Sequence, residues 1–457
     1  MEKLQPFLNH SHTVFSNFRL RDAINKPEDL LDYALEIGLK GITITDHEIL
    51  SGHFKAYQHI EKNKEKFKDF KLAFGNEIYL VDKEVVEWAR ENNEKIPFYH
   101  FILIAKNQNG YKALKELSSK AWSNSFWFRG MERVPTYKDE LAEIMEKYQG
   151  DIIATSACVG GELPQSLIKY HDEPTKENKK KVHDLIVWLK DVFGDDLYFE
   201  LQPSHNREQI VANKMLEKVG QTYGVTRIVS TDAHYLNKEK AQAHKIYLQA
   251  SQGEREVESF YATTYVMNTQ ELEEFFEENY LQELIKGTHE IMNKIEPISF
   301  EQSVRIPKAH IPEFTLSNIF EPHYNKYEYI SSYAKSDYEI DRYYLHLIAE
   351  GMEKYNQELN EENLERIDLE LGEIYHITKK LNQPLSSYFV LTKELVDIMW
   401  KVSLVGVSRG SASCYYLNYL LGIVQINPIK YNLPHWRFLS KERATLPDKF
   451  MSLLIEK

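Results

Sequence analysis

The sequence predicts an α/β protein whose first part is a barrel-like sheet of parallel strands, followed by a smaller second part. Short apolar strands are expected at 7–12, 41–45, 72–74, 98–105, 151–156, 197–202 and 227–231. Helical patterns lie between most of them, an alternation typical of a parallel sheet. About seven such units within roughly 240 residues favour a barrel over an open sheet. After about residue 295 the pattern changes, which predicts two domains, 1–295 and 296–457.

Helix signals support this order of elements. Pro27, Glu28 and Asp29 mark a helix start, because proline fits the first turn and carboxylates favour the positive end of the helix dipole. In the second part, residues 335–380 are expected to be helical, followed by another helix at 387–401. The apolar positions of the longer helix recur at 3-4-3 spacing, and its many acids are expected to face solvent: Leu364, Ile367, Leu371 and Ile374.

The composition limits the class of protein. The chain has 457 residues, a net charge of −13, 42% hydrophobic and 27% charged residues, which suits a globular protein of two or three domains. No apolar run reaches the ~18 residues of a membrane span, and no signal peptide is visible. Two distant cysteines, Cys158 and Cys414, fit a reducing compartment. We therefore expect a cytoplasmic protein with no membrane partner. The acidic balance argues against DNA binding by the whole surface, although the end from residue 391 is locally basic.

Two short motifs predict a cluster of metal ligands. In His10-Ser11-His12 and Asp232-Ala233-His234, the first and third side chains of an extended segment point to the same face. Either motif alone is a weak signal, because a chain with 17 histidines contains such pairs by chance. Other candidates fall at the expected strand ends, where α/β barrels carry their chemistry, and His100 lies within its strand. This shared placement is the strongest argument from the residues themselves.

The full set of candidate ligands is His10, His12, Asp22, His47, Glu77, His100, Cys158, Asp232 and His234. Imidazoles, carboxylates and a thiolate suit Zn2+, Mn2+ or Fe2+ better than Ca2+ or Mg2+. So many donors exceed one tetrahedral site and imply two or three ions, for which phosphoester hydrolysis is the natural chemistry. Asp46 is expected to hold one of the imidazoles in place. Taken singly, His100 and Cys158 fit ordinary buried core positions as well.

Several strings resemble one protein family. They are His10-Ser-His12, Thr45-Asp-His47, Gly75-Asn-Glu77, HFILIAK from His100, TSACVGGE from Thr155 and STDAHY from Ser230. They are similar to the PHP (polymerase and histidinol phosphatase) domain at the N-terminus of the bacterial DNA polymerase III alpha subunit. The resemblance implies a distorted (β/α)7-like barrel, all nine ligand positions filled, Zn2+ or Mn2+ as the metal, and 3′–5′ exonuclease activity. Residues 17–19 look like an insertion ahead of Asp22.

The resemblance continues beyond residue 300. The stretch 406–413, followed by LLGI from Leu420, NPIKY from Asn427 and RFLSKER from Arg437, is similar to the start of the family C polymerase palm. It implies a smaller α+β domain that binds primer-template DNA and dNTPs, with Mg2+ for the chemistry. Arg409, Gly410 and Ser411 can offer a guanidinium, backbone N–H groups and a hydroxyl to a triphosphate. Arg437 is expected to make a second phosphate or sugar contact.

The chain departs from the polymerase pattern at its end. The family places a second aspartate two positions after the first, whereas Asp448 is followed by Lys449 and Phe450. Asp448 is therefore the one catalytic carboxylate expected here, and a two-metal transfer site needs more than one. We expect the rest of the polymerase to be a separately encoded or removed C-terminal part. Contacts with replisome proteins such as the sliding clamp are expected through that part, in a bacterial or phage-infected cell.

Three interpretations remain open from the sequence. The chain is the first part of a replicative DNA polymerase, a stand-alone PHP phosphoesterase, or a non-enzymatic scaffold whose metals stabilise the fold. The motifs at 406–443 favour the first over the second, and the filled ligand set counts against the third.

Overall fold

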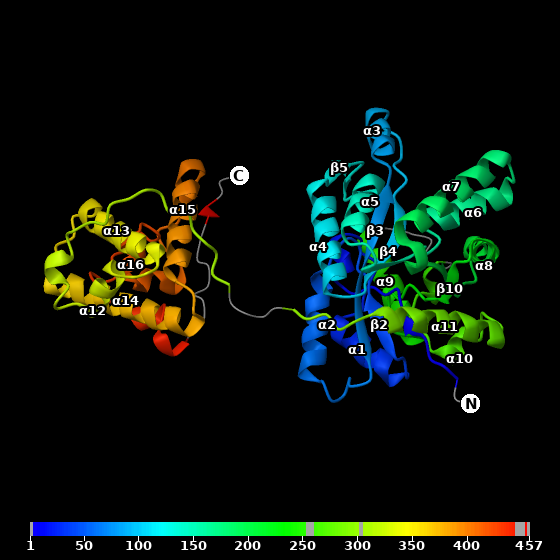
Figure 1. The fold of residues 1–457 in the computed structure, drawn as a ribbon, viewed down its shortest axis with the longest axis horizontal. Helices are drawn as coiled ribbons and strands as arrows, with labels where there is room; N and C mark the ends of the chain where they lie inside the picture. The colour runs from blue at the N-terminus through cyan, green and yellow to red at the C-terminus, as the bar shows by residue number, and fades with distance from the viewer. Residues whose placement is uncertain (1–2, 253–259, 301–304, 444–452, 455–457) are drawn as a thin grey trace. The chain divides into compact units, whose positions relative to one another are not determined.

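The computed structural model describes residues 3–252, 260–300, 305–443 and 453–454. The chain divides into two compact units, Met1–Phe300 and Glu301–Lys457, each with its own buried apolar core. Figure 1 shows the strands of the sheet in the first unit and a mainly helical second unit.

A curled sheet forms the centre of unit 1. Its strands follow the order β1 (Phe7–Leu8), β2 (Gly41–Ile44), β3 (Lys71–Val81), β4 (Tyr99–Ala105), β8 (Ile152–Thr155), β9 (Leu197–Leu201) and β10 (Thr226–Val229). The segments after β1 and β10 meet in a parallel bridge between Ser11 and Ala233. There the His12 N–H donates to the Ala233 carbonyl (2.9 Å), and the Ala233 N–H donates to the His10 carbonyl (3.2 Å). The two predicted ligand motifs therefore join the ends of the sheet, and the barrel-like α/β fold is confirmed.

One strand contradicts the expected all-parallel sheet. β4 runs antiparallel to both of its neighbours, β3 and β8. The connection from β3 to β4 through α3 (Lys83–Glu91) returns the chain to the edge it has just left. β4 therefore begins at the edge where the parallel strands end, which places His100, its second residue, at that mouth.

Strand alternation divides the inside of the barrel into an apolar floor and a polar mouth. The floor is a cluster of inward side chains, closed by the end of helix α11: Phe7, Ala73, Ile102, Ile104, Ile153, Ala157, Tyr198, Ile228, Ile291 and Ile295. Every second residue of a strand faces the same side. Glu77, His100, Thr155 and Glu200 lie two or four positions from floor residues of their own strands, so they face inward at the mouth.

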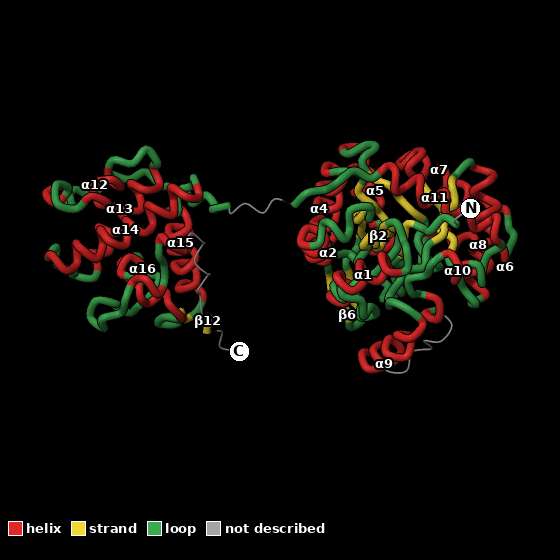
Figure 2. Tube along the Cα trace, turned by 90° about the horizontal axis from the view of Figure 1, so that it is seen from below, coloured by secondary structure: helices red, strands yellow, loops and turns green. Residues whose placement is uncertain are grey.

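Helices cover the outside of the sheet, with α1 on β2, α4 on β4, α8 on β9 and α11 on β10. Figure 2 shows the strands lying among these helices. Their bounds are α1 Pro27–Glu36, α2 Ser51–Lys62, α4 Gln108–Ser123, α5 Lys138–Lys147, α6 Glu162–Asp172, α7 Lys176–Phe193, α8 Arg207–Tyr223, α9 Ala241–Gln252, α10 Thr269–Leu272 and α11 Glu278–Lys294. The sequence analysis missed a hairpin of β5 (Phe126–Phe128) and β6 (Met131–Arg133), and the short strand β7 (Thr136–Tyr137) beside β3.

Unit 2 is mainly helical. Its helices are α12 Glu328–Ala334, α13 Glu339–Lys354, α14 Glu361–Leu381, α15 Ser386–Val402 and α16 Tyr416–Leu420. Two short strands, β11 (Leu404–Val405) and β12 (Leu453–Leu454), pair antiparallel, so the expected α+β part has little sheet among its described residues. The apolar positions predicted on α14 are all buried in the core of this unit. No helix in the described parts of the chain is both long and apolar enough to cross a membrane.

A buried ion pair holds the start of α16 in unit 2. The Glu370 side chain is fully buried and lies 2.6 Å from Nε of Arg366. Its two oxygens also accept the backbone N–H groups of Tyr416 and Leu417, each at 2.9 Å. Burial raises the pKa of Glu370 to about 7, although the Arg366 guanidinium acts in the opposite direction. One carboxylate on α14 thus fixes the segment that follows residues 406–413.

Candidate metal centre

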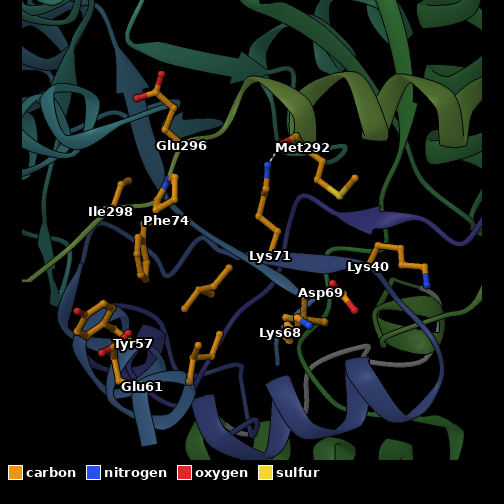
Figure 3. Close-up of a pocket in the computed structure, with 14 residues that line it drawn as sticks. Lys40, Tyr57, Glu61, Lys68, Asp69, Lys71, Phe74, Met292, Glu296 and Ile298 are labelled. Carbon is orange, nitrogen blue, oxygen red and sulfur yellow. Dashed lines mark hydrogen bonds between the residues drawn. The ribbon is translucent and has the colours of Figure 1, made fainter. Parts of the chain in front are cut away.

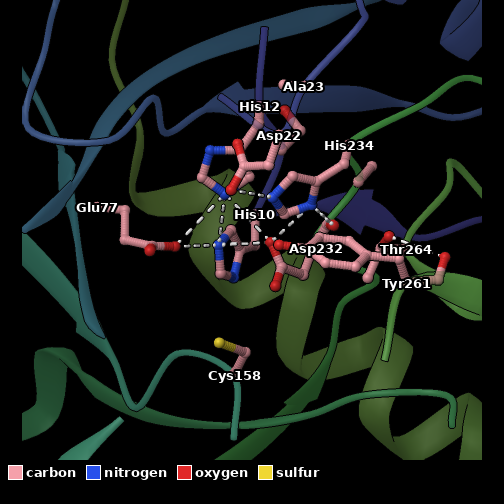
Figure 4. Close-up of polar contacts among 12 residues, drawn as sticks. His10, His12, Asp22, Ala23, Glu77, Cys158, Asp232, His234, Tyr261 and Thr264 are labelled. Carbon is pink, nitrogen blue, oxygen red and sulfur yellow. Dashed lines mark hydrogen bonds and ion pairs between the residues drawn. The ribbon is translucent and has the colours of Figure 1, made fainter. Parts of the chain in front are cut away.

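The nine predicted ligands come together at the mouth of the barrel. Figure 4 labels seven of them: His10, His12, Asp22, Glu77, Cys158, Asp232 and His234. Their elements explain this: two motifs follow β1 and β10, while the others follow β2 and β8 or lie on β3, β4 and the loop before α1. Eight of the side chains are at most 3% exposed, and His100 is 25% exposed. His100 is therefore the most open of the nine residues.

The first group of facing donor atoms comes from His10, His12, Glu77 and Asp232, whose nearest atoms all lie within 4.8 Å of one another. Nε2 of His10 is 2.7 Å from Oε2 of Glu77 and 3.0 Å from Oδ1 of Asp232. Nε2 of His12 is 3.1 Å from the same Asp232 oxygen. These atoms could hold one divalent ion with modest side-chain movement.

A second group comprises His12, His47 and His234, which also meet within 4.8 Å. Oδ2 of Asp22 lies 3.2 Å from Nε2 of His47 and 3.6 Å from Nε2 of His234. Asp22, which follows the expected insertion, therefore reaches the cluster. This arrangement offers three imidazoles and one carboxylate to another ion.

Glu77 connects these groups to His100 and Cys158. Its Oε1 atom lies 2.7 Å from Nδ1 of His100 and 3.0 Å from Nδ1 of His47, while its Oε2 atom faces His10. The Cys158 sulfur is 3.6 Å from Nδ1 of His100. The carboxylate is thus placed to bridge two ions, with the thiol and His100 on one side.

The donor set fits divalent cations. Asp22, Glu77 and Asp232 are buried, and the ion pairs described for them are all with histidines. Buried carboxylates are costly without a compensating positive charge. Asp22 Oδ1 is buried without a hydrogen-bond partner among the described residues. Glu77 Oε1 and Asp232 Oδ1 meet only histidines of the same cluster, at 2.7 to 3.5 Å. Positive ions would satisfy these atoms.

The titration of the cluster follows the same balance. Burial would raise the pKa of Asp232, but the His10 and His234 charges outweigh it and hold the pKa well below its usual range. Burial would lower the pKa of His47, but the Asp22 and Glu77 charges outweigh it and raise that pKa to about 10. The buried carboxylates of the cluster therefore require positive charge close by, from an imidazolium or from a bound cation. Burial raises the pKa of the Cys158 thiol, and the negative charges of Asp232 and Glu77 raise it further.

Three further residues orient the histidines. Nδ1 of His10 lies 2.9 Å from Oε1 of Glu200, which is fully buried. Nδ1 of His12 lies 3.0 Å from the Ser16 hydroxyl, and that hydroxyl donates to Oδ1 of Asp46 at 2.8 Å. Asp46 therefore acts on His12 through Ser16, whereas a direct contact was expected. These contacts assign the proton to Nδ1 of each ring and turn its Nε2 lone pair toward the cluster.

Glu200 and Ser16 were missed by the sequence analysis. Glu200 is the one acid in the apolar strand LYFEL, and an inward acid in such a strand is a signal that could have been used. Ser16 gives no comparable signal, because its role depends on a loop that brings it beside Asp46.

The residues predicted to bind a nucleotide lie on neighbouring segments of unit 2. Arg409, Gly410 and Arg437 are exposed, and Ser411 is half-buried. The 3-10 helices η6 (Gly410–Cys414) and η7 (His435–Arg437) contact each other. Asp448, the predicted catalytic carboxylate, lies outside the described residues.

Another cleft of unit 1, of about 480 Å3, lies at the far end of the strands (Figure 3). It is lined by Lys71, the first residue of β3, whose Nζ donates to the Met292 carbonyl at 2.7 Å. Lys71 precedes Glu77 by six residues, which is roughly 20 Å along a strand. This mostly apolar cleft is therefore separate from the metal centre.

Comparisons with known proteins agree with the division of the chain into two units. The PHP domain family matches residues 9–204, and the bacterial DNA polymerase III alpha NTPase domain family matches residues 342–451. A DNA-directed DNA polymerase of Bacillus phage SPbeta is 42% identical over 466 residues, covering 96% of this chain and 36% of that protein. The DNA polymerase III subunit alpha of Borreliella burgdorferi is 29% identical over 445 residues, covering 96% of this chain and 34% of that protein.

Among solved structures, an amidohydrolase from Chromobacterium violaceum shares 11% identity and a TM-score of 0.29, over 50% of this chain and 87% of that chain. This likeness is too distant to carry an argument.

The fold and the family matches make the first unit a PHP domain, followed by a stretch of the polymerase III alpha NTPase domain. The chain is similar to DNA polymerases of the polymerase III alpha type over these stretches, and the resemblance seen in its sequence is confirmed. The chain spans about a third of the length of the curated relatives it matches.

Proposed function

We propose that the metal centre of unit 1 hydrolyses phosphodiester bonds at the 3′ end of DNA, as a 3′–5′ exonuclease that holds two or three Zn2+ or Mn2+ ions. The observation that carries this is the set of buried imidazole and carboxylate atoms that face one another at the open end of the barrel. When bound, clustered divalent ions lower the pKa of a bound water and clamp phosphate oxygens.

The chain's own residues position that chemistry. Glu200 keeps the proton of His10 on Nδ1, so the lone pair of Nε2 is available to a metal ion. Glu77 offers one oxygen toward His10 and the other toward His100, so it would help to hold ions on both sides of the cluster. The apolar floor closes the barrel below, so the substrate approaches from the mouth, beside the partly exposed His100.

We also propose that the chain acts in DNA replication as the first part of a polymerase III alpha subunit. The match at 342–451 supports this, and the exposed Arg409 and Arg437 on touching segments are placed to receive a dNTP triphosphate. Nucleotidyl transfer with Mg2+ on a primer-template then requires a further C-terminal part, through which the sliding clamp would be contacted. The phosphoesterase and scaffold alternatives lack an account of this second match.

The exonuclease is tested with the full chain and a 5′-labelled single-stranded DNA. After EDTA treatment we expect no shortening of the strand, and after addition of Mn2+ or Zn2+ we expect stepwise shortening from the 3′ end. A strand with a blocked 3′ end and a circular single strand are the controls, and both should remain intact. Degradation that is independent of metal, or cleavage of the circle, would contradict the proposal.

A further inference from the structure

A second cleft in unit 1, of about 550 Å3, opens beside the metal centre. His100 belongs to both, because it lines the cleft and faces Glu77 and Cys158 of the cluster. The other side chains that matter here are Arg19, Tyr79, Lys95, Phe98 and Arg133. The cleft therefore leads from the surface to the mouth of the barrel.

The cleft carries positive charge that is not balanced at its walls. Three cationic side chains line it, and no carboxylate is among its described lining residues, although the chain as a whole carries −13. The Nε atoms of Arg19 and Arg133 are buried and have no hydrogen-bond partner among the described residues. The buried acid Glu48, whose charge acts on Arg19, uses Oε1 to accept from the Tyr79 N–H and the Thr136 hydroxyl. Two guanidinium groups whose Nε atoms have no partner among the described residues favour an anionic ligand.

Aromatic rings hold these two arginines in place. The Arg19 guanidinium lies 4.8 Å from the centre of the Tyr79 ring, and that of Arg133 lies 5.7 Å from the centre of the Phe98 ring. Stacking fixes a guanidinium while its N–H edge remains free for bidentate contacts with phosphate. The Tyr79 hydroxyl is also buried without a described partner. The wall is thus built from ordered donors.

The β5–β6 hairpin forms one side of this cleft through Met131 and Arg133. Trp127 on its first strand pairs with Glu132 and so lies on the opposite face of the hairpin, whereas the partly exposed rings of Phe98 and Tyr99 line the cleft. Basic side chains next to exposed aromatic rings are typical of single-strand binding, where bases stack and cations follow the backbone. The volume of the cleft lies within the usual range of ligand sites.

We propose that this cleft binds the phosphodiester backbone of single-stranded DNA and guides its 3′ end to the metal centre. Arg19 and Arg133 contact backbone phosphates, and the rings of Phe98 and Tyr99 lie beside them in the same cleft. The proposal rests on the proposed nuclease function, because it names the route by which that site receives its substrate.

Binding is measured by fluorescence anisotropy with the full chain, its metals retained, and a labelled oligothymidylate whose 3′-terminal phosphorothioate linkages slow hydrolysis. We expect Arg19→Ala and Arg133→Ala each to raise Kd about tenfold, because each removes charged hydrogen bonds. Each should also reduce the slope of log affinity against log salt by about 0.7, the value for one phosphate contact on a single strand. Arg207→Ala removes an exposed charge on α8 and should change neither quantity.

Metal content is measured for every variant, because Arg19 lies close to Asp22 in sequence, whereas Arg133 lies on a different element. Unchanged affinity and salt slope in both arginine variants would overturn this proposal even if the wild type degrades DNA. Competition by inorganic phosphate as effective as that by the strand would also overturn it. Arginine-dependent binding in a chain that degrades no DNA would instead contradict the nuclease alone.

Discussion

Asp232→Asn is expected to reduce the metal-dependent degradation of single-stranded DNA more than about 100-fold, because the loss of partners outside the ligand set already costs 10–100-fold at metal sites. Oδ1 of Asp232 lies within 3.1 Å of Nε2 of both His10 and His12. The variant replaces an anionic donor with a neutral amide at the point where these two imidazoles meet. The number of bound ions should fall as well.

The substitution suits the backbone at this position. Asp232 has a φ of 50°, and asparagine tolerates this left-handed conformation as well as aspartate does. The circular dichroism spectrum of the variant should therefore match that of the wild type. Asp191→Asn, on the exposed side of α7, is the matched control and should keep full activity. Equal activity of the wild type and Asp232→Asn would remove Asp232 from the site.

Glu370→Ala is expected to destabilise unit 2 by roughly 3–5 kcal/mol, the usual cost of removing one partner of a buried ion pair. The variant leaves the Arg366 guanidinium, 17% exposed, without its carboxylate. It also removes the acceptors of the Tyr416 and Leu417 N–H groups. The segment from Gly410 to Leu420 should loosen first, because this carboxylate is what anchors it to α14.

Hydrogen exchange followed by mass spectrometry measures this change separately for each unit. Amides of α14 and α16 should lose protection in Glu370→Ala, while those of the barrel strands should keep it. Glu365→Ala changes an exposed acid on the same helix and should alter stability by no more than about 0.5 kcal/mol. Wild-type protection at 410–420 in Glu370→Ala would show that the ion pair does not hold this segment.

The sequence predicted the location of the candidate ligands where that location follows from strand geometry. Asp232 and His234 were placed at the mouth because the residues that follow a parallel strand lie at one edge of the sheet. The inward orientation of Glu77 also follows from period-2 alternation with Ala73. The barrel itself was predictable because its apolar strands alternate with helices. The sequence therefore indicated a shared location for the candidate ligands before their distances were known.

Other features depend on tertiary contacts that no local pattern encodes. The reversal of β4 is decided by how the chain returns after α3, and only that reversal explains why His100 at the start of a strand joins residues at strand ends. The contact of Asp46 with His12 runs through Ser16, which a loop supplies. In unit 2, the helices expected over 335–380 and 387–401 correspond to α13, α14 and α15, whereas the described residues hold little of the sheet that an α+β domain implies.

The number of metal ions bound per chain tests the central claim most directly. The full chain is purified without chelators, supplied with Zn2+ or Mn2+, freed of unbound ions, and analysed by inductively coupled plasma mass spectrometry against its protein concentration. Two or three ions per chain are predicted, since the facing donor atoms form at least two groups that share His12. A chain that binds no divalent ion under these conditions would contradict the account.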